Sequence, residues 1–278
     1  IAADIRDDDG DEVEAGLVDA GRAGPRVTIP AGEGEKTRAR WGEITDRLLA
    51  AGLGRDGGVI ALGGGVVGDL AGFVAATYMR GIPVVQIPTS LLAMVDASVG
   101  GKTGVDTPGG KNLVGAFHPP TAVIIDPEVV ASLPEDQRRQ GLAEALKHAA
   151  IVDLDYGEGI VAAARQLLAG ESDAVLRLVR RSVEIKADVV SRDEREGGLR
   201  EILNFGHTVA HALEHVSGYR IPHGSAVALG MVWEAELGEE VGVTEPGTPG
   251  RIAHWLDLVG LPTDPRVTWA SLGLEGGG

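Results

Sequence analysis

The chain has 278 residues, 44% of them hydrophobic, and a formal net charge of −16 at pH 7. This length and composition can bury one large core or two smaller ones. The acidic balance argues against nucleic acid as a partner, because such a binder needs a basic surface to neutralise phosphates, and equally against an anionic membrane. The chain has no cysteine, which excludes disulfides and thiol nucleophiles and fits a cytoplasmic protein. No apolar run reaches the roughly 18 residues of a membrane-spanning helix, so we expect no membrane partner.

The first half of the chain alternates short apolar segments with helical ones. Residues 1–24 are acidic and irregular, and we expect them to be frayed. Strands are predicted over 27–29, 59–62, 84–87 and 122–125, and helices over 35–51 and 67–78. Strands that alternate with helices are typical of a parallel sheet built from βαβ units.

Strand signals fade after Pro134. Helices are predicted over 136–152, 158–169, 172–191, 205–216, 224–241 and 248–259. In 172–191, for example, Leu176, Val179 and Val183 keep helical spacing. We therefore expect two domains, an α/β Rossmann-like nucleotide-binding domain over 1–134 and an α-helical domain over 135–278.

A glycine-rich segment, Gly63-Gly64-Gly65-Val66-Val67-Gly68-Asp69, follows a predicted strand and opens a predicted helix. Glycines at 63, 65 and 68 fit the G-x-G-x-x-G pattern, in which the backbone approaches a pyrophosphate closely at a helix N-terminus. The acidic residue that usually follows about 20 positions later is not evident. The segment therefore favours a nucleotide site, with a simple tight turn as the alternative.

Two Gly-Gly-Lys units follow, ending at Lys102 and Lys111. A phosphate-binding P-loop is excluded, because Asp96 stands where that motif needs its first glycine. We instead expect flexible loops that present two ammonium groups to a phosphate or carboxylate. The chain has only five lysines beside 20 arginines, so lysines in such motifs are expected to serve where a compact charge is needed.

Histidines and one carboxylate gather in the second half. Glu144 is on the same predicted helix face as Lys147, which indicates either a site or a surface ion pair. His207 and His211 are four residues apart on one helix, and His223 begins the next. Histidines with a carboxylate and no cysteine suit Zn²⁺ or a similar ion. Spacing alone pairs His207 with His211 and cannot choose between His211 and His223 as a ligand.

These motifs, in this order, resemble the 3-dehydroquinate synthase family from about residue 29 to about residue 262. The segments that carry the resemblance are Gly63–Asp69, Met79-Arg80-Gly81, 88–96, Gly101-Lys102-Thr103, Gly110-Lys111-Asn112, 144–147, Arg200…Asn204…Gly206-His207-Thr208 and His223-Gly224. The resemblance implies conversion of 3-deoxy-D-arabino-heptulosonate 7-phosphate into 3-dehydroquinate and phosphate, in the shikimate pathway. It also implies a route of metal-assisted transient oxidation by NAD, phosphate elimination, reduction and aldol closure.

The resemblance assigns residues as well. The implied NAD contacts are Glu33, Lys36, Gly64, Gly65, Asp69, Thr89, Ser90, Leu92, Lys102 and Lys111. One divalent ion, Zn²⁺ or Co²⁺, would be bound by Glu144, His207 and His223, which leaves His211 for the substrate. The implied substrate contacts are Asp96, Lys102, Lys111, Asn112, Lys147, Lys186, Arg200, Asn204 and His211. Arg80 would reach the site of a neighbouring subunit, so the resemblance implies a homodimer.

Two parts of the family pattern are not found. Residues 1–24 do not show the family's strand and turn that contact adenosine, and no lysine follows Lys186. We therefore expect a chain truncated at both ends. The alternatives are another sugar-phosphate cyclase, a metal- and NAD-dependent polyol dehydrogenase, or a catalytically impaired fragment. Asn204 and His211 favour the dehydroquinate reaction, because several related cyclases replace one of them.

Overall fold

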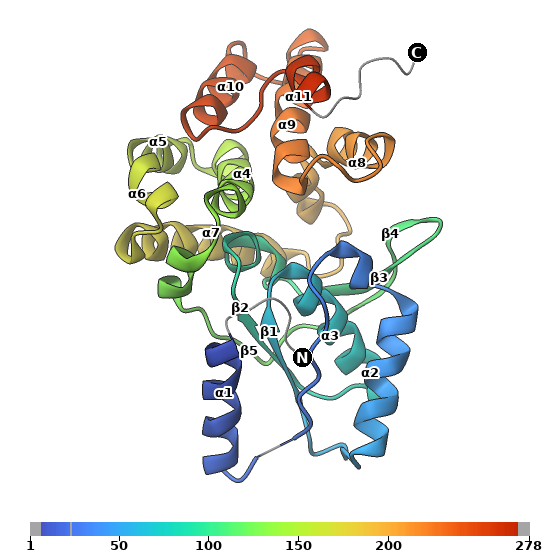
Figure 1. Ribbon diagram of the computed structural model, residues 1–278. Helices are drawn as coiled ribbons and strands as arrows, with labels where there is room; N and C mark the ends of the chain where they lie inside the picture. Colours follow the sequence, from blue (N-terminus) through green and yellow to red (C-terminus); the bar gives the residue numbers. More distant parts are fainter. Residues whose placement is uncertain (1–6, 23, 272–278) are drawn as a thin grey trace. The chain divides into compact units, whose positions relative to one another are not determined.

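The computed structural model describes residues 7–22 and 24–271. The chain divides into two compact units, Ile1–Asp126 and Pro127–Gly278, which are described separately (Figure 1). The boundary predicted after residue 134 lies inside the second unit, and as a domain boundary it stays a prediction.

A parallel sheet is the centre of the first unit. Its strands β1 (Val59–Gly63), β2 (Val84–Pro88) and β5 (Ala122–Val123) lie in the order β1-β2-β5, and Val59 is opposite Val84. Helices α2 (Arg38–Ala50) and α3 (Gly65–Thr77) lie on one side of β1, and α1 (Asp7–Asp19) lies on the other (Figure 1). Strands β1 and β2 are connected through α3, which makes the predicted βαβ unit, whereas the connection from β2 to β5 contains the residues of a π turn and an antiparallel hairpin.

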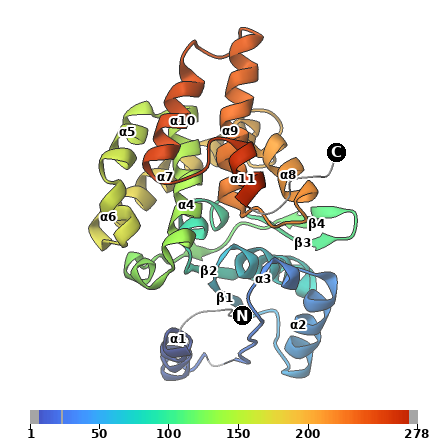
Figure 2. The same ribbon diagram turned by 45° about the horizontal axis from the view of Figure 1, so that its top comes forward.

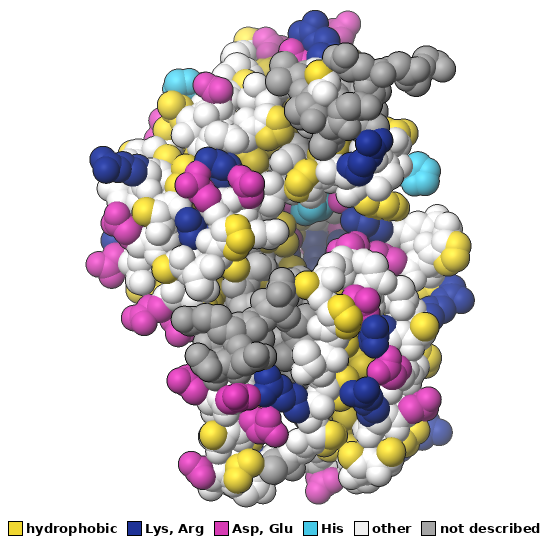
Figure 3. All heavy atoms as spheres, viewed as in Figure 1, with side chains coloured by type: hydrophobic (Ala, Val, Ile, Leu, Met, Phe, Trp, Pro, Cys, Tyr) yellow, Lys and Arg dark blue, Asp and Glu magenta, His cyan; other side chains and the backbone are white. Residues whose placement is uncertain are grey.

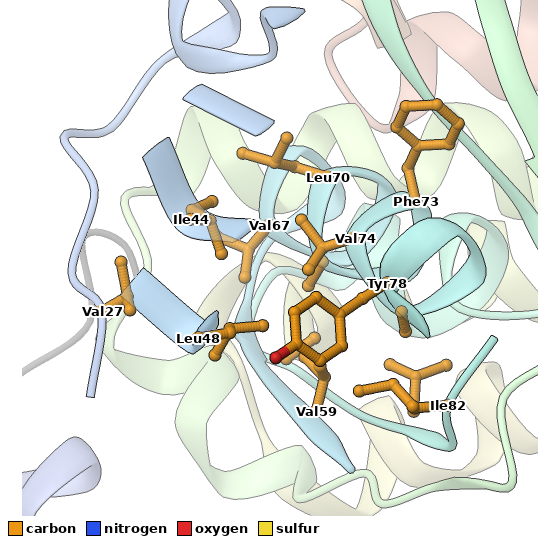
Figure 4. Close-up of a cluster of buried hydrophobic side chains, with 14 of the residues drawn as sticks. Val27, Ile44, Leu48, Val59, Val67, Leu70, Phe73, Val74, Tyr78 and Ile82 are labelled. Carbon is orange, nitrogen blue, oxygen red and sulfur yellow. The ribbon is translucent and has the colours of Figure 1, made fainter. Parts of the chain in front are cut away.

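The core of this unit lies between the sheet and its helices. Ile44 and Leu48 of α2 pack with Leu70 and Val74 of α3 and with Val59 of β1, all of them buried (Figure 4). Helix α3 is buried almost continuously from its second turn onward, which explains why its sequence is apolar on every side. The core therefore holds the start of α3 at the carboxyl end of β1.

An antiparallel hairpin of β3 (Lys102–Thr107) and β4 (Gly110–Phe117) carries both Gly-Gly-Lys units. The prediction of flexible loops is therefore wrong here. The strands approach closely at paired glycines, because a Cβ on Gly115 would collide with the carbonyl oxygen of Thr103. Such glycines remove the alternation of apolar and polar residues by which a strand is recognised.

The second unit is helical. Its elements are η4 (Pro127–Ser132), α4 (Glu135–Val152), α5 (Leu154–Ala162), α6 (Ala164–Ala169), α7 (Ser172–Arg192), η5 (Leu199–Asn204), α8 (His207–Val216), α9 (His223–Glu240), α10 (Thr248–Leu258) and α11 (Pro265–Ser271). Helix α4 packs against α5, α7 and α9, and α9 lies between α8 and α10 in both ribbon views (Figures 1 and 2). The predicted helices are confirmed, except that residues 158–169 belong to two helices, α5 and α6. Helix α5 begins after Asp153, whose side chain accepts a hydrogen bond from the Tyr156 N–H.

Three smaller elements of the first unit lie beside functional motifs. They are the 3₁₀ turns η1 (Glu33–Glu35) and η2 (Tyr78–Arg80) and the π turn η3 (Ala93–Ala97).

Two predictions for the start of the chain are wrong. Residues 7–19 form helix α1 rather than a frayed segment. Two of its acidic side chains have a basic partner, since Arg26 lies 2.5 Å from Asp11 and 3.5 Å from Glu14. Residues 1–6 lie outside the described part. Residues 27–29 are no extended strand, because Thr28 alone forms a bridge, and the apolar pattern reflects burial of Val27 and Ile29 in the core.

Acidic and basic side chains are interspersed over the face shown in Figure 3, and the basic ones form no continuous patch there. Within residues 7–22 and 24–271, none of the helices combines the length and apolarity that a membrane crossing requires.

Candidate active site

The glycine-rich turn connects β1 to α3. Gly63 has a φ of 153°, and a Cβ there would lie 2.7 Å from the side chain of Val67. Gly64 is the N-cap of α3 and Gly65 its first residue, and no acidic side chain occupies the first turn. The N–H groups and positive dipole end of α3 are thus suited to an anionic ligand. Gly68 also serves packing, because a Cβ there would lie 2.5 Å from Oε1 of Gln86 on β2.

Lys36, just before α2, forms an ion pair with Asp69 near the glycine-rich turn. Its side chain is buried, and its Nζ lies 2.5 Å from Oδ2 of Asp69 on α3. Burial lowers the pKa of Lys36, but the carboxylates of Asp69 and Glu33 raise it by more, so the amine stays charged. Lys111 of β4 reaches the same segment, its Nζ 3.6 Å from Oε1 of Glu33. The structure thus brings together Glu33, Lys36, Asp69 and Lys111.

The residues after β2 lie at the same edge of the sheet as the glycine turn, because parallel strands share their carboxyl ends. The Thr89 N–H donates to the carbonyl oxygen of Gly63 (3.0 Å), and Ser90 Oγ accepts from the Ala93 N–H (3.3 Å). Leu92 precedes the π turn η3, which contains Asp96. These predicted cofactor and substrate residues therefore adjoin the glycine turn.

Two further predicted residues sit in left-handed backbone turns. Arg80 is exposed, with a φ of 70°, directly after α3. Asn112 has a φ of 55°, and its N–H donates to Oδ1 of Asp106 (3.0 Å). Asp106 also donates its own N–H to the carbonyl oxygen of Lys36 (2.7 Å), which joins the hairpin to the Lys36 segment.

In the second unit, a carboxylate and two histidines converge from three helices. Oε1 of Glu144, from the middle of α4, lies 3.5 Å from Nε2 of His207 and 3.1 Å from Nε2 of His223. The ligand atoms of the three residues all lie within 4.8 Å of one another. The His211 ring lies 5.5 Å from that of His207 between centroids, but His211 is not a member of this cluster.

The cluster has the donor set and surroundings of a metal site. Nδ1 of His207 donates to the carbonyl oxygen of Phe205 (3.2 Å), and Nδ1 of His223 lies 3.4 Å from Oε1 of Glu214. Each ring therefore presents Nε2 to Glu144 and turns its other nitrogen to an outer acceptor, as metal-binding histidines do. Three such ligands suit Zn²⁺ or Co²⁺ with a coordination position left for chemistry.

Glu144 and Lys147 are not a surface ion pair. Both side chains are almost fully buried, and Lys147 Nζ lies 2.6 Å from Oε2 of Glu144. Burial raises the pKa of Glu144, but Lys147 and His207 lower it by more, so the carboxyl group is ionised as a metal ligand must be. The surface alternative is therefore wrong.

The second unit also buries other predicted substrate residues. Lys186 and Arg200 are 7% and 1% exposed, and cations are rarely buried to this extent without a partner or a function. Arg200 Nη1 donates to the carbonyl oxygen of Glu194 (2.6 Å). Asn204 Nδ2 donates to Oε1 of Glu196 (3.0 Å), and both residues line an open depression of about 530 Å³.

Two supporting carboxylates were not predicted. Glu234 of α9 accepts hydrogen bonds from the N–H groups of Gly206 (2.7 Å) and Val209 (3.1 Å). It caps α8, whose N-cap Gly206 has no side chain to do so. Glu214 of α8 faces His223. A glycine at the N-cap of a helix signals that a side chain from another part of the chain must accept the hydrogen bonds of its first N–H groups. Nothing in the sequence identified Glu234 as that residue.

Known protein families and structures match most of this chain. The family model described as 3-dehydroquinate synthase N-terminal matches residues 26–140, and the C-terminal model matches residues 141–273. The 3-dehydroquinate synthase of Symbiobacterium thermophilum is 49% identical over 255 residues, which are 91% of this chain and 71% of that protein. The enzyme of Pelobacter propionicus is 48% identical over 256 residues, 92% of this chain and 71% of that protein.

Solved structures with this fold include two synthases. ValA, a 2-epi-5-epi-valiolone synthase of Streptomyces hygroscopicus subsp. jinggangensis with NAD⁺ and Zn²⁺ bound, is 30% identical with a TM-score of 0.87, covering 98% of this chain and 78% of that one. A 2-deoxy-scyllo-inosose synthase complexed with carbaglucose-6-phosphate, NAD⁺ and Co²⁺ is 26% identical with a TM-score of 0.83, covering 99% and 77%. Sulfoacetaldehyde reductase from Bifidobacterium kashiwanohense, at 16% identity and a TM-score of 0.68 over 98% of this chain and 82% of that one, shares the fold alone.

The parallel α/β unit followed by a helical unit is the architecture of the sugar-phosphate-cyclase class, in keeping with the fold similarity to the two synthase structures, and the Glu–His–His cluster lies in the helical unit. Within that class, the two family models cover nearly the whole chain, and the identity to curated members approaches one half. The chain belongs to the 3-dehydroquinate synthase family, and it is an enzyme, a lyase of the shikimate pathway.

Proposed function

We propose that this chain converts 3-deoxy-D-arabino-heptulosonate 7-phosphate into 3-dehydroquinate and phosphate, with NAD and one divalent ion, Zn²⁺ or Co²⁺. The observation that carries the proposal is the convergence of Glu144, His207 and His223 on one point. The 49% identity to a curated 3-dehydroquinate synthase supports the choice of reaction. A homodimer and a cytoplasmic location are parts of the proposal that rest on the sequence alone.

When bound, the two cofactors would supply chemistry that side chains lack, namely polarisation of a substrate hydroxyl by the metal ion and reversible hydride transfer by NAD. The net redox change is zero, so NAD is regenerated in each turnover. Glu144, His207 and His223, of which Glu144 is buried and the two histidines are partly exposed, would hold the ion.

In the first unit, the chain would bind the cofactor and anionic parts of the substrate. The N–H groups at Gly64 and Gly65 would face the pyrophosphate of NAD, with Asp69 and Lys36 fixing the adjoining segment. The other cofactor contacts we propose are Glu33, Thr89, Ser90, Leu92, Lys102 and Lys111. Compact ammonium groups such as these two lysines bind phosphate as point charges.

In the second unit, we propose buried cations as substrate contacts. Arg200 carries a planar guanidinium that matches a carboxylate, and Lys147 and Lys186 provide ammonium groups for hydroxyls or phosphate. Asn204 and His211 would orient hydroxyl groups. Asp96 and Asn112 of the first unit are also substrate contacts that we propose from the family resemblance, and Arg80 would reach the partner subunit's site. Holding the reacting groups in place accounts for much of the rate enhancement.

The deciding experiment measures phosphate release from the heptulosonate phosphate, with NAD and Zn²⁺ added, before and after chelation. We expect release without net NADH, its loss on chelation and its return with Zn²⁺ or Co²⁺. Lys111→Ala and His223→Ala are expected to abolish release, whereas His215→Ala is the matched control, because His215 is an exposed histidine of α8 outside the cluster. Retained turnover in His223→Ala would remove that residue from the ligands.

A second candidate is another sugar-phosphate cyclase, which the 30% identity and TM-score of 0.87 with ValA favour. Phosphate release from a different sugar phosphate, with none from the heptulosonate phosphate, would support it. Net NADH formation with glycerol would instead support a polyol dehydrogenase, and failure to bind NAD and metal would indicate an impaired fragment.

A further inference from the structure

Glu214 is a buried carboxylate outside the proposed ligand set. It lies on α8, about two turns from His207, and is 3% exposed. A carboxylate is rarely buried to this degree without a charged or hydrogen-bonding partner, because its desolvation is costly. Its position next to a metal-site histidine therefore calls for an explanation.

The contact is with the outer nitrogen of His223. Nδ1 of His223 lies 3.4 Å from Oε1 of Glu214, while Nε2 of the same ring lies 3.1 Å from Oε1 of Glu144. The imidazole of His223 is thus held between two carboxylates, one in the cluster and one behind it. His207 is arranged differently, because its outer nitrogen donates to the neutral carbonyl oxygen of Phe205.

The charges around the cluster give the second carboxylate a role. The ammonium group of Lys147 lies 2.6 Å from Glu144, so a bound divalent cation would share its only carboxylate ligand with a buried positive charge. That arrangement weakens the attraction for the metal ion. Glu214 adds a negative charge behind His223, which offsets the ammonium group and makes the imidazole a stronger donor.

The end of helix α8 is formed by main-chain contacts of Glu214. At the end of the helix, the Tyr219 N–H (2.7 Å) and the Ser217 hydroxyl (3.0 Å) donate to the carbonyl oxygen of Glu214. These are main-chain contacts that any residue at this position would make. The main chain of Glu214 thus serves the helix end, whereas its carboxylate faces His223.

We propose that Glu214 is a positioning residue that orients the His223 ring and strengthens metal binding through its charge. The inference rests on the metal site of the proposed function. In this role Glu214 acts through His223, which its carboxylate faces.

The test is a Co²⁺ titration of the chelator-treated chain of 278 residues, monitored by visible absorption and calorimetry. We expect Glu214→Gln, which keeps the shape and removes the charge, to weaken Co²⁺ binding roughly 10- to 100-fold and to alter the Co²⁺ spectrum. Glu158→Gln is the control: it removes the same charge in the same unit from a carboxylate that accepts a hydrogen bond from Trp255 (3.0 Å), and it is expected to bind Co²⁺ within about twofold of the unmodified chain.

The outcomes separate the inference from the proposed function. If the unmodified chain binds no Co²⁺, the proposed metal site fails. If it binds Co²⁺ and Glu214→Gln binds equally well, the positioning role is overturned. The affinities are compared only at temperatures at which circular dichroism shows both metal-free forms to be folded. If the two forms bind Co²⁺ equally well at those temperatures, the positioning role is also overturned. Should Glu214→Gln not fold, Glu214→Asp decides: weaker binding supports the role, and unchanged binding refutes it.

Discussion

Removing the charge of Glu144 is expected to destabilise the metal-free protein as well as abolish activity. In Glu144→Gln, the buried Lys147 ammonium loses the carboxylate that lies 2.6 Å away. Breaking a buried ion pair from one side costs about 3–5 kcal/mol, because the remaining charge stays desolvated. For a unit of this size that corresponds to a fall of roughly 10 °C in the unfolding midpoint.

The double variant Glu144→Gln/Lys147→Met separates the two effects. Replacing both partners of a buried pair with neutral side chains is often neutral for stability, so we expect most of the lost stability to return while phosphate release stays absent. Thermal unfolding of the chelator-treated protein, followed by circular dichroism, measures the first effect, and the phosphate assay measures the second. A metal-free Glu144→Gln within about 1 kcal/mol of the unmodified chain would refute the reasoning.

Three further predictions follow from the packing and charges of the second unit. Gly230→Ala places a methyl group against the carbonyl oxygen of the α8 N-cap, so we expect a loss of about 1–3 kcal/mol together with weaker Co²⁺ binding. Gly159→Ala, with open space at its Cβ, is the control, and equal effects of the two would contradict this explanation. The Arg181 guanidinium and the Tyr156 N–H hold the pKa of Asp153 below its ordinary value, so its contribution is present above pH 3.8 and is lost as the pH falls through the folded-state pKa. Asp153→Asn should accordingly lower the unfolding midpoint at pH 7 and have a progressively smaller effect as the pH falls below 3.8; a constant difference would exclude the charge as the cause. Burial lowers the pKa of His223, but Glu144 and Glu214 raise it by more, to about 10, so metal binding at pH 7 should release about one proton. Calorimetry in two buffers of different ionisation enthalpy checks this, and zero release would show that the ring is already neutral.

The folded-state pKa of His223 also has a consequence for the metal-free protein. A histidine whose pKa is raised on folding contributes stability that is fully present below its unfolded value, and this contribution is lost as the pH rises toward 10. Because bound metal replaces the proton, the same loss is not expected of the metal-bound form.

Much of the fold followed from local patterns. The spacing of Leu176, Val179 and Val183 predicts helix α7 because one helical face must be apolar to pack. The buried strands β1 and β2 were likewise evident as short apolar runs bounded by glycine and proline. The β3–β4 hairpin was not, because Gly104 and Gly115 are needed where its strands touch and leave no alternating pattern.

The histidines mark the limit of reasoning from spacing. Their number, the absence of cysteine and a carboxylate on a neighbouring helix already indicated a metal site. Spacing along α8 pointed to His211 beside His207, since residues four apart share a helix face. Which histidine joins Glu144 depends instead on how α9 packs against α8, and no periodicity within one helix carries that information.

The same division applies to the charged groups around the site. The sequence by itself determined which residue types were present: few lysines, placed in glycine and histidine motifs, and one glutamate in an otherwise apolar part of α4. Only the tertiary structure decided that Lys147 lies buried against Glu144, that Lys36 meets Asp69, and that Glu214 faces His223. The reason is physical: the local pattern sets which side chains a helix can bury, whereas the environment that shifts a pKa or orients a ligand comes from residues distant in the chain.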